Sequence, residues 1–444
     1  MVFAVAEKGT SSTVAVLRTS PSTVLADYHE LLNLAGYQDV IPKDAEVALK
    51  INISWHFFFP AASTTPWQLD GVIRSLETDG YDLAKVHACH NRTVVIDAHL
   101  GERENKQLNV VQAHGLRNVH LYEGEEWIDV REAVGDLTKQ FLCLNDVYPG
   151  GFSIPRRFIG ESIIHLPTVK THVFTTTTGA MKNAFGGLLN ERRHWTHSRI
   201  HETLVDLLMI QKKIHPGVFA VMDGTFAGDG PGPRCMIPHV KNVILASADQ
   251  VAIDAVAARL MGFNPLEIDY IRLAHERGLG CGDPRDIRIV GDASAAAENW
   301  HFDGPYKKMT FASHMQRLIY WGPLKKPVEW SLRSWLAPWS YLASVSYHDA
   351  FWYPLRARKQ MAEAINSDWG RLFFDWENAR VAPDGRGFEL DGVMEPAVAG
   401  ATPQAPGARS AAGRAQVRIP GWRERLGLLV MAVKESPEAK QRKR

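Results

Sequence analysis

The chain has 444 residues, of which 45% are hydrophobic and 22% are charged, a composition that excludes a globally disordered protein. At about 100–200 residues per domain, this length fits two compact units or one large α/β unit with appendages. The 50 Lys and Arg residues balance 49 Asp and Glu residues, so the net charge of +1 gives no general attraction for nucleic acid, and none is expected as a partner.

The cysteines and the N-terminal residues limit the cellular setting. The four cysteines are scattered singly, without a C-x-x-C pair, which argues against a disulfide scaffold and against an iron–sulfur motif in this chain. The N-terminal residues lack the basic and apolar regions of a signal peptide, and no apolar run reaches the roughly 18 residues of a membrane span. We therefore expect a cytoplasmic protein, with peripheral membrane association as the alternative.

Short β-rich runs alternate with helical patterns from residue 45 to residue 295. Amphipathic patterns bounded by Pro and Gly predict helices at 66–78, 201–214 and 249–260. Apolar runs predict strands at 47–53, 84–90, 117–122, 140–145, 162–167, 217–223, 241–247 and 286–291. This alternation favours a doubly wound α/β fold with a largely parallel sheet over residues 45–295, preceded by an N-terminal segment of residues 1–44.

The C-terminal part of the chain has a different character. Nine of the thirteen tryptophans lie after residue 295, most of them interleaved with Lys and Arg. We expect a Trp-rich, mainly helical extension over residues 296–394 that packs on the α/β core, and a membrane or protein contact surface is the alternative. Residues 395–416 are rich in Ala, Gly and Pro and predict a disordered linker. Residues 417–444 predict a short amphipathic segment and a basic tail.

The densest set of reactive side chains lies between residues 166 and 201. It begins where a predicted strand ends, the place where open α/β sheets bind ligands. A lone histidine is usually structural and a Thr run can be a plain strand, but this density of basic and polar side chains indicates a functional site. The Gly-rich part lacks a complete Walker pattern, so a nucleotide-binding P-loop is disfavoured.

Several of these side chains suit an anion. Lys170 and Arg92 can pair with a carboxylate or a phosphate, and the Thr178 hydroxyl and Asn183 amide can add hydrogen bonds. Arg92 follows one predicted strand, and Asp223 ends another, where it can serve as a base or a carboxylate ligand. The sequence therefore predicts a small anionic molecule as the substrate, held at the carboxyl edge of the sheet.

The side chains expected to carry out the chemistry are a lysine and several histidines. Lys182, if desolvated, can act as a base or a covalent anchor, and His172 can exchange protons. His197 can act as a second acid–base group or, together with His194, as a ligand of a divalent metal. The spacing of His194, His197 and His201 resembles that of ligands on one helix face, but the glutamate of a metalloprotease motif is absent, and His201 is expected to cap the next helix.

At these motifs the chain resembles the large bacterial and archaeal domain-of-unknown-function family 362. The resemblance covers residues 45–295 and rests on LPTVKTH, TTTTGAMKNAFGGLL, HPGVFAVMDG, GPGPR and LASADQVAIDAVAARLMGF. The later YHDAFWYPLRARK and DWGRLF resemble the C-terminal extension of one branch of that family. Many relatives carry ferredoxin-like cluster segments that this chain lacks, so the resemblance does not imply a shared redox role.

A more distant similarity leads to nickel-pincer lactate racemases. His172, Lys182 and His197 follow one another at spacings of ten and fifteen residues, similar to a histidine, a cofactor-bearing lysine and a nickel-binding histidine in those enzymes. Arg92 lies where they have an Asp-x-Thr-Arg turn. The resemblance implies a nickel-pincer-like cofactor attached to Lys182, although Gly-Ala-Met-Lys replaces the usual Gly-Gly-x-Lys.

The leading hypothesis is an enzyme that acts on a small carboxylate or phosphate through Lys/His acid–base chemistry or with help from a metal or cofactor. An isomerase or racemase, or an oxidoreductase, fits this description. Two alternatives come from other classes. One is a redox partner that uses an iron–sulfur cluster of another protein, and the other is a membrane-peripheral binding protein that docks through its Trp-rich region.

Overall fold

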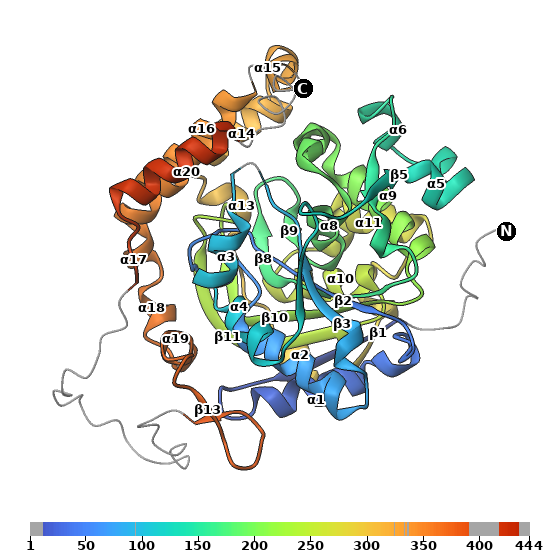
Figure 1. Ribbon diagram of the computed structural model, residues 1–444, viewed down its shortest axis with the longest axis vertical. Coiled ribbons are helices and arrows are strands. Elements are labelled where there is room, and N and C mark those ends of the chain that lie inside the picture. Colours follow the sequence, from blue (N-terminus) through green and yellow to red (C-terminus); the bar gives the residue numbers. More distant parts are fainter. Residues whose placement is uncertain are drawn as a thin grey trace.

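The fold is centred on a ten-stranded, mostly parallel sheet (Figure 1). The computed structural model describes residues 12–93, 95–323, 325–332, 334, 337–389 and 417–434. The main strand order is β12-β1-β11-β10-β7-β2-β3-β4, in which only β11 runs antiparallel to its neighbours. The strands are β1 Thr13–Arg18, β2 Val47–Ile51, β3 Val86–His90, β4 Arg117–His120, β7 Ser162–Leu166, β8 Thr168–His172, β9 Thr176–Thr178, β10 Val218–Asp229, β11 Ile237–Ser247 and β12 Arg288–Gly291.

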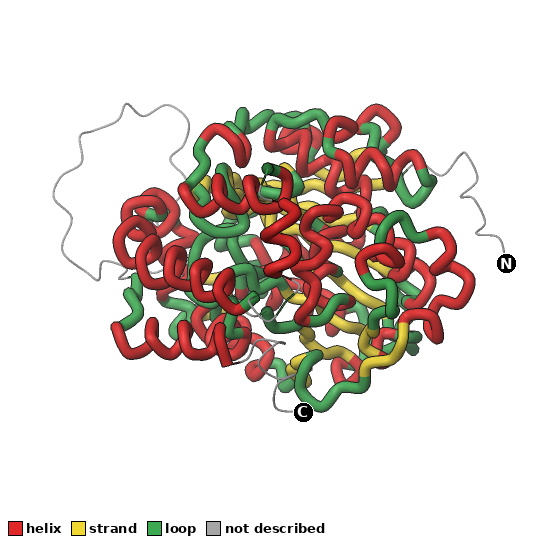
Figure 2. Tube along the Cα trace, turned by 90° about the horizontal axis from the view of Figure 1, so that it is seen from above, coloured by secondary structure: helices red, strands yellow, loops and turns green. Residues whose placement is uncertain are grey.

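Helices cover both faces of this sheet (Figure 2). Side chains alternate between two hydrophobic clusters, so that Val14 and Val16 enter one cluster while Ala15 enters the other. Helices α1 Val24–Leu34 and α2 Pro66–Thr78 pack on one face, and α9 Ile200–Ile214, α10 Gln250–Met261 and α11 Asp269–Glu276 pack on the other. The doubly wound α/β architecture expected from the sequence is confirmed.

Most predicted elements are confirmed, including helix α2, which spans the expected 66–78. The strand predicted at 140–145 is wrong, because that stretch contains the end of a 3-10 helix and the start of α6 Leu144–Val147. Its backbone N–H groups at Leu142, Cys143 and Leu144 donate to the Asp206 carboxylate instead of a neighbouring strand. Strand β1, which we did not predict, brings the N-terminal segment into the sheet between β11 and β12.

The strands that follow Pro167 extend the sheet beyond the carboxyl end of β7. Strands β7 and β8 are separated only by this proline, and the long β10 pairs first with β7 and then with β8. Strand β8 turns back as β9, placing Lys170 opposite Thr178 and His172 opposite Thr176. The short helices α7 Ala180–Asn183 and α8 Phe185–Leu188 follow. The Thr run is therefore a strand, and it carries Thr178 to the edge where ligands are expected.

The C-terminal extension is helical, as predicted, and lies along one side of the core (orange in Figure 1). It comprises α14 Phe311–Trp321, α15 Lys325–Leu332, α16 Pro338–Val345, a π-helical segment Ser346–Ala357 and α19 Asp368–Phe374. Helix α20 Trp422–Lys434 packs against α16. No described helix is both long and apolar enough to cross a bilayer. The predicted linker at 395–416 lies outside the described residues.

The remaining elements complete the periphery of the domain. Two small antiparallel pairs are formed by β5 with β6 and by β13 with β14. The bounds of these strands are β5 Trp127–Asp129, β6 Ser153–Pro155, β13 Arg380–Val381 and β14 Phe388–Glu389. Three short helices are α3 Ala98–Glu104, α4 Gln107–Ala113 and α5 Val130–Val134.

Candidate functional site

A cavity of about 630 Å³ lies where the carboxyl ends of β2, β3 and β8 meet helices α14, α15 and α16 of the extension. Its floor comes from the α/β core and includes the turn between β9 and α8. Its roof is apolar and aromatic, and includes Phe311, Met315 and Ile319 of α14, Leu332 of α15 and Trp339 of α16. The site therefore combines the ligand-binding edge of an open α/β sheet with a cover that only the C-terminal extension supplies.

The polar side chains of this cavity are basic or neutral. Its lining contains five Lys or Arg residues and five histidines, and no Asp or Glu occurs among the described residues that line it. These residues are Lys50, Lys170, Lys182, Arg193, Arg234, His90, His172, His194, His197 and His348. A cavity with this charge pattern is electrostatically suited to an anion.

Lys182 is held in place by a buried carboxylate. The Asp254 side chain accepts hydrogen bonds from the backbone N–H groups of Ala180 (2.6 Å) and Met181 (3.2 Å), the two residues that directly precede Lys182 in α7. Gly179 makes this approach possible, because a Cβ atom there would lie 2.6 Å from Cγ of Asp254. Asp254 thus acts as a helix cap that positions Lys182 and not as a ligand of the cavity.

Burial makes the cavity lysines unusually ready to lose a proton. Burial, reinforced by the nearby Arg193 guanidinium, lowers the pKa of Lys182 to about 7. Burial also lowers the pKa of Lys50 to about 8, with Arg193 contributing again, and that of Lys170 falls well below its usual value. Lys50 donates to the Ile51 carbonyl (2.6 Å), and Lys170 donates to the Ala62 carbonyl (2.9 Å). An amine with a pKa near 7 exists in both protonation states at neutral pH, as a general base or nucleophile requires.

The two histidines predicted to be catalytic lie beside Lys182. The Phe174 backbone N–H donates to Nδ1 of His172 (3.1 Å), so the neutral imidazole carries its proton on Nε2. His197 is half-buried, and its buried Nδ1 atom has no hydrogen-bond partner among the described residues. Burial, strengthened by the Lys182 charge, holds the pKa of both imidazoles well below the usual value. Both rings therefore remain neutral at neutral pH.

His194 and His201 have different surroundings from those expected. Nε2 of His194 lies 3.1 Å from the Leu332 carbonyl and 3.3 Å from the Tyr341 hydroxyl, so this side chain contacts the extension. Neither His194 nor His197 belongs to a group of three potential metal ligands in the described part of the chain. The prediction that His201 caps α9 is wrong, because it lies in the first turn and its Nδ1 accepts from the Tyr270 N–H.

The structure brings most of the predicted anion ligands together. Lys170, Thr178 and Asn183 line the cavity, although the Asn183 amide also donates to the Lys50 carbonyl (2.8 Å). Arg92 is not among the lining residues, and its guanidinium lies 5.0 Å from the centre of the Tyr122 ring. Asp223 is fully buried away from the cavity.

Asp223 has a structural environment. Its carboxylate accepts from Tyr28 (3.1 Å), Thr65 (2.5 Å), Trp67 (2.9 Å) and Thr225 (2.6 Å). These donors tie helices α1 and α2 to strand β10. The hydrogen bonds offset the burial that raises the pKa of this carboxyl.

Three cationic lining residues, Lys50, Arg193 and Arg234, were not chosen from the sequence. Lys50 is the only charged residue in the strand VALKI, all of whose residues are buried, and a charge at such a position is a signal that could have found it. Arg193 lies within the predicted reactive stretch but was not singled out there. Gly187 leaves room for the Lys50 side chain, since a Cβ at this position would lie 3.2 Å from its Cε. The aromatic roof could not be assigned to the site from local sequence.

The structure places three of the four cysteines in environments that disfavour a reactive thiolate. Cys89, Cys143 and Cys235 are buried, and burial raises the thiol pKa of Cys89 and Cys143 to about 12. No cysteine belongs to a group of three potential metal ligands among the described residues. The redox-partner hypothesis stays a prediction.

A family profile agrees with the resemblance seen in the sequence. Residues 47–259 match the sequence profile of a family described as Domain of unknown function (DUF362). A thylakoid-associated protein of Synechocystis sp. is 30% identical over 126 residues, a match that covers 27% of this chain and 38% of that protein. A crystal structure of a Thermotoga maritima protein, 13% identical, aligns with 50% of this chain and 56% of its own at a TM-score of 0.29.

Proposed function

We propose that this chain, whose residues 47–259 form a domain of the DUF362 family, is an enzyme that binds an anionic substrate carrying an apolar group. The observation that carries the proposal is a cavity lined by five Lys or Arg residues with no carboxylate among its described lining residues. The Arg193 charge lowers the pKa of both Lys50 and Lys182, so the charged forms of these basic groups disfavour one another. A carboxylate or phosphate is the ligand class that compensates them.

The size of the cavity and its apolar roof indicate a substrate larger than a small acid. A volume of about 630 Å³ lies in the range that drug-sized ligands occupy, well above the need of a two- or three-carbon acid. The anionic group fits the floor beside Lys50, Lys170 and Lys182, and an aliphatic or aromatic body fits the roof formed by α14, α15 and α16. Burial of that body against the roof would supply much of the binding free energy.

Lys182 and the two neutral imidazoles are the groups that we assign to chemistry. In the molecules in which Lys182 is unprotonated, its amine can remove a proton from the carbon next to the anionic group and return it as the ammonium, while the Nε2–H of neutral His172 donates a hydrogen bond to the enolate that forms. This pairing suits an isomerase or racemase. If the substrate has a carbonyl group, the same amine can instead form a Schiff base.

The resemblance to nickel-pincer racemases suggests a second route through the same residues. Lys182 would carry the cofactor, and His197, whose buried Nδ1 has no described hydrogen-bond partner, would serve as the metal ligand. When bound, such a cofactor supplies a hydride acceptor. The mass of the intact purified protein, compared with that of Lys182→Ala, tests this route, because an adduct present only in the parent would support it and the unmodified mass in both would oppose it.

The substrate class is tested by calorimetric titration with decanoate and three matched probes. We expect decanoate to bind one site at least tenfold more tightly than decan-1-ol, which lacks the charge, and than acetate, which lacks the apolar chain. Decylammonium should not bind. Lys182→Met should weaken decanoate binding about tenfold or more, because a hydrogen bond to a charged group contributes about 1.5–3 kcal/mol. Equal affinities for decanoate and decan-1-ol would contradict an anion site.

A membrane-peripheral role is the second candidate, and exposed aromatic side chains favour it. On the helices that roof the cavity, Phe311 is 71% exposed and Trp330 is 65% exposed, with Trp321 and Trp339 above 40%. The Synechocystis relative is described as thylakoid-associated. Trp330→Ser with Trp339→Ser should abolish cosedimentation with vesicles of mixed zwitterionic and anionic phospholipid, whereas Trp422→Ser on α20 should retain it. Cosedimentation that survives the double substitution would contradict docking through this face.

A further inference from the structure

A second cluster of side chains lies at the rim of the cavity, where β3 and β4 end. His90 and His120 are the last residues of these parallel strands and face each other in the pairing register. Their imidazole rings have centroids 4.6 Å apart. Helix α3 places Glu102 against both rings, and Gly101 lets the helix approach closely, since a Cβ there would lie 2.5 Å from Ile53. The cluster thus combines three elements of the core.

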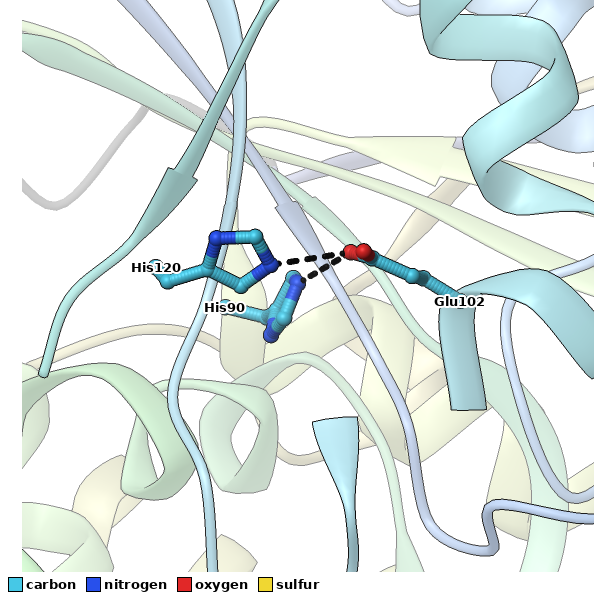
Figure 3. Close-up of side chains that lie close together, drawn as sticks. All are labelled: His90, Glu102 and His120. Atoms are coloured by element: carbon cyan, nitrogen blue, oxygen red, sulfur yellow. Dashed lines mark hydrogen bonds and ion pairs between the residues drawn. The ribbon is translucent and has the colours of Figure 1, made fainter. Parts of the chain in front are cut away.

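The two imidazoles converge on one carboxylate oxygen (Figure 3). Nε2 of His90 lies 2.9 Å, and Nε2 of His120 lies 3.1 Å, from Oε2 of Glu102. The three candidate ligand atoms all lie within 4.8 Å of one another. Bonds of about 2.0–2.1 Å to a tetrahedral Zn²⁺ separate neighbouring ligand atoms by roughly 3.3 Å. Small side-chain rotations would therefore open the cluster enough to admit an ion.

The surroundings resemble the outer ligand shell of a metal site. The Asn118 amide donates to Glu102 (2.8 Å), and Nδ1 of His120 lies 3.6 Å from Oε2 of Glu123. A carboxylate behind a ligating histidine is a common support, because it orients the ring and makes it a stronger ligand. His99 adds a further imidazole 3.5 Å from the other oxygen of Glu102.

The charged neighbours of this cluster differ from those of a similar cluster elsewhere in the described chain. Glu46, His87 and Glu161 also form a group of three potential ligands, but the Arg157 guanidinium already pairs with both of those carboxylates. Glu102 instead pairs with three histidines, His90, His99 and His120. Glu102 is 3% exposed and His90 is 1% exposed, so water offers little compensation. Nδ1 of His90 also has no hydrogen-bond partner among the described residues.

We propose that His90, Glu102 and His120 bind a divalent transition-metal ion at the rim of the anion cavity, and that Zn²⁺ fits this donor set best. Two imidazoles and one carboxylate are ligands of catalytic zinc sites, where three protein ligands leave a position for water or substrate. His90 also lines the cavity, so the ion would lie next to the bound anion. Metal binding at this cluster does not depend on the reaction proposed for Lys182.

The test uses the full chain after removal of metals with a chelator. Calorimetric titration with Zn²⁺ should show one ion per chain, and Co²⁺ should give the visible absorption of a four-coordinate ion with nitrogen and oxygen ligands. Zn²⁺ should also raise the melting temperature, because an ion that binds only the native state stabilises it. Absence of stoichiometric binding, or binding without a shift in melting temperature, would overturn the proposal.

Two sets of variants locate the ion. Glu102→Gln keeps the shape of the side chain, and it should weaken Zn²⁺ binding at least 100-fold, as should His120→Gln. The matched controls His194→Gln and His197→Gln alter the other candidate histidines and should leave the affinity unchanged. If either variant proves unstable, the Co²⁺ spectrum of the other still reports on the site. Loss of binding in His197→Gln with retention in Glu102→Gln would place the ion elsewhere and overturn the assignment.

Discussion

Gly179→Ala should destabilise the protein by about 3–5 kcal/mol. The new Cβ would overlap the Asp254 carboxylate, with Cγ only 2.6 Å away, and Asp254 cannot retreat without releasing the N–H groups of Ala180 and Met181. Overpacking costs about 1–3 kcal/mol, and the loss of hydrogen bonds to a charged group adds a similar amount. Denaturation with urea, followed by circular dichroism, measures the effect.

A nearby glycine provides the control for this substitution. A Cβ at Gly186 would meet its nearest neighbours, the Arg193 and Lys50 side chains, at 3.7 Å, which is an ordinary contact. Gly186→Ala should therefore be close to neutral in stability. In a background that carries Asp254→Ala, the clash disappears and Gly179→Ala should cost less than about 1 kcal/mol. An equal cost in both backgrounds would show that Asp254 is not what excludes a side chain at this position.

Replacing Lys182 with Met should change how stability depends on pH. The pKa of this lysine is about 7 in the native protein against 10.5 ordinarily, so between these pH values the unfolded chain binds a proton that the native chain does not. Stability therefore rises with pH through this window and is lost as the pH falls from 10.5 towards 7. Met carries no charge, so the variant should be more stable than the parent at pH 7 by on the order of 3–5 kcal/mol.

The clearest readout is the difference between the variant and its parent at two pH values. This difference should shrink by about 2–3 kcal/mol between about pH 7 and pH 9, while packing effects of Met cancel. Other groups with shifted pKa values, such as the Cys89 thiol, contribute equally to both proteins. Lys212→Met, on the exposed side of α9, should show a constant difference. A constant difference for Lys182→Met would mean that its amine is not desolvated.

Local sequence patterns predict much of this fold, because they describe elements whose backbone hydrogen bonds follow a regular pattern. Helix α2 has Pro66 in its first turn and an apolar face, and its bounds agree with those predicted. Residues 140–145 look equally apolar, but their N–H groups bind Asp206, which lies more than 60 residues away in α9. A hydrogen bond to a distant side chain leaves no periodic signal. Strand β1 is short, and its pairing with β11 and β12 joins distant segments.

The candidate site could be predicted only where it is continuous in sequence. Lys170, His172 and Lys182 lie close in the chain, and the end of a buried strand directs them to the ligand-binding edge. Asp223 was expected at a strand end, but β10 continues to Asp229, and three donors from outside this strand bind the Asp223 carboxylate away from the cavity. The roof comes from residues more than 100 positions further on, and no local pattern connects it to the floor.

The central claim is that lysine amines whose pKa burial lowers towards neutral pH form an anion site. The pH dependence of decanoate affinity tests this claim most directly. Decanoate itself stays ionised above about pH 6, because an ordinary carboxyl titrates near 4. Since the anion binds most tightly when Lys182 is protonated, and the pKa of this amine is about 7, we predict that the dissociation constant rises above that pH by up to about tenfold per pH unit. Lys182→Met should bind more weakly and lose this slope near pH 7. An affinity that is independent of pH from 6 to 9 in the parent protein would contradict the account.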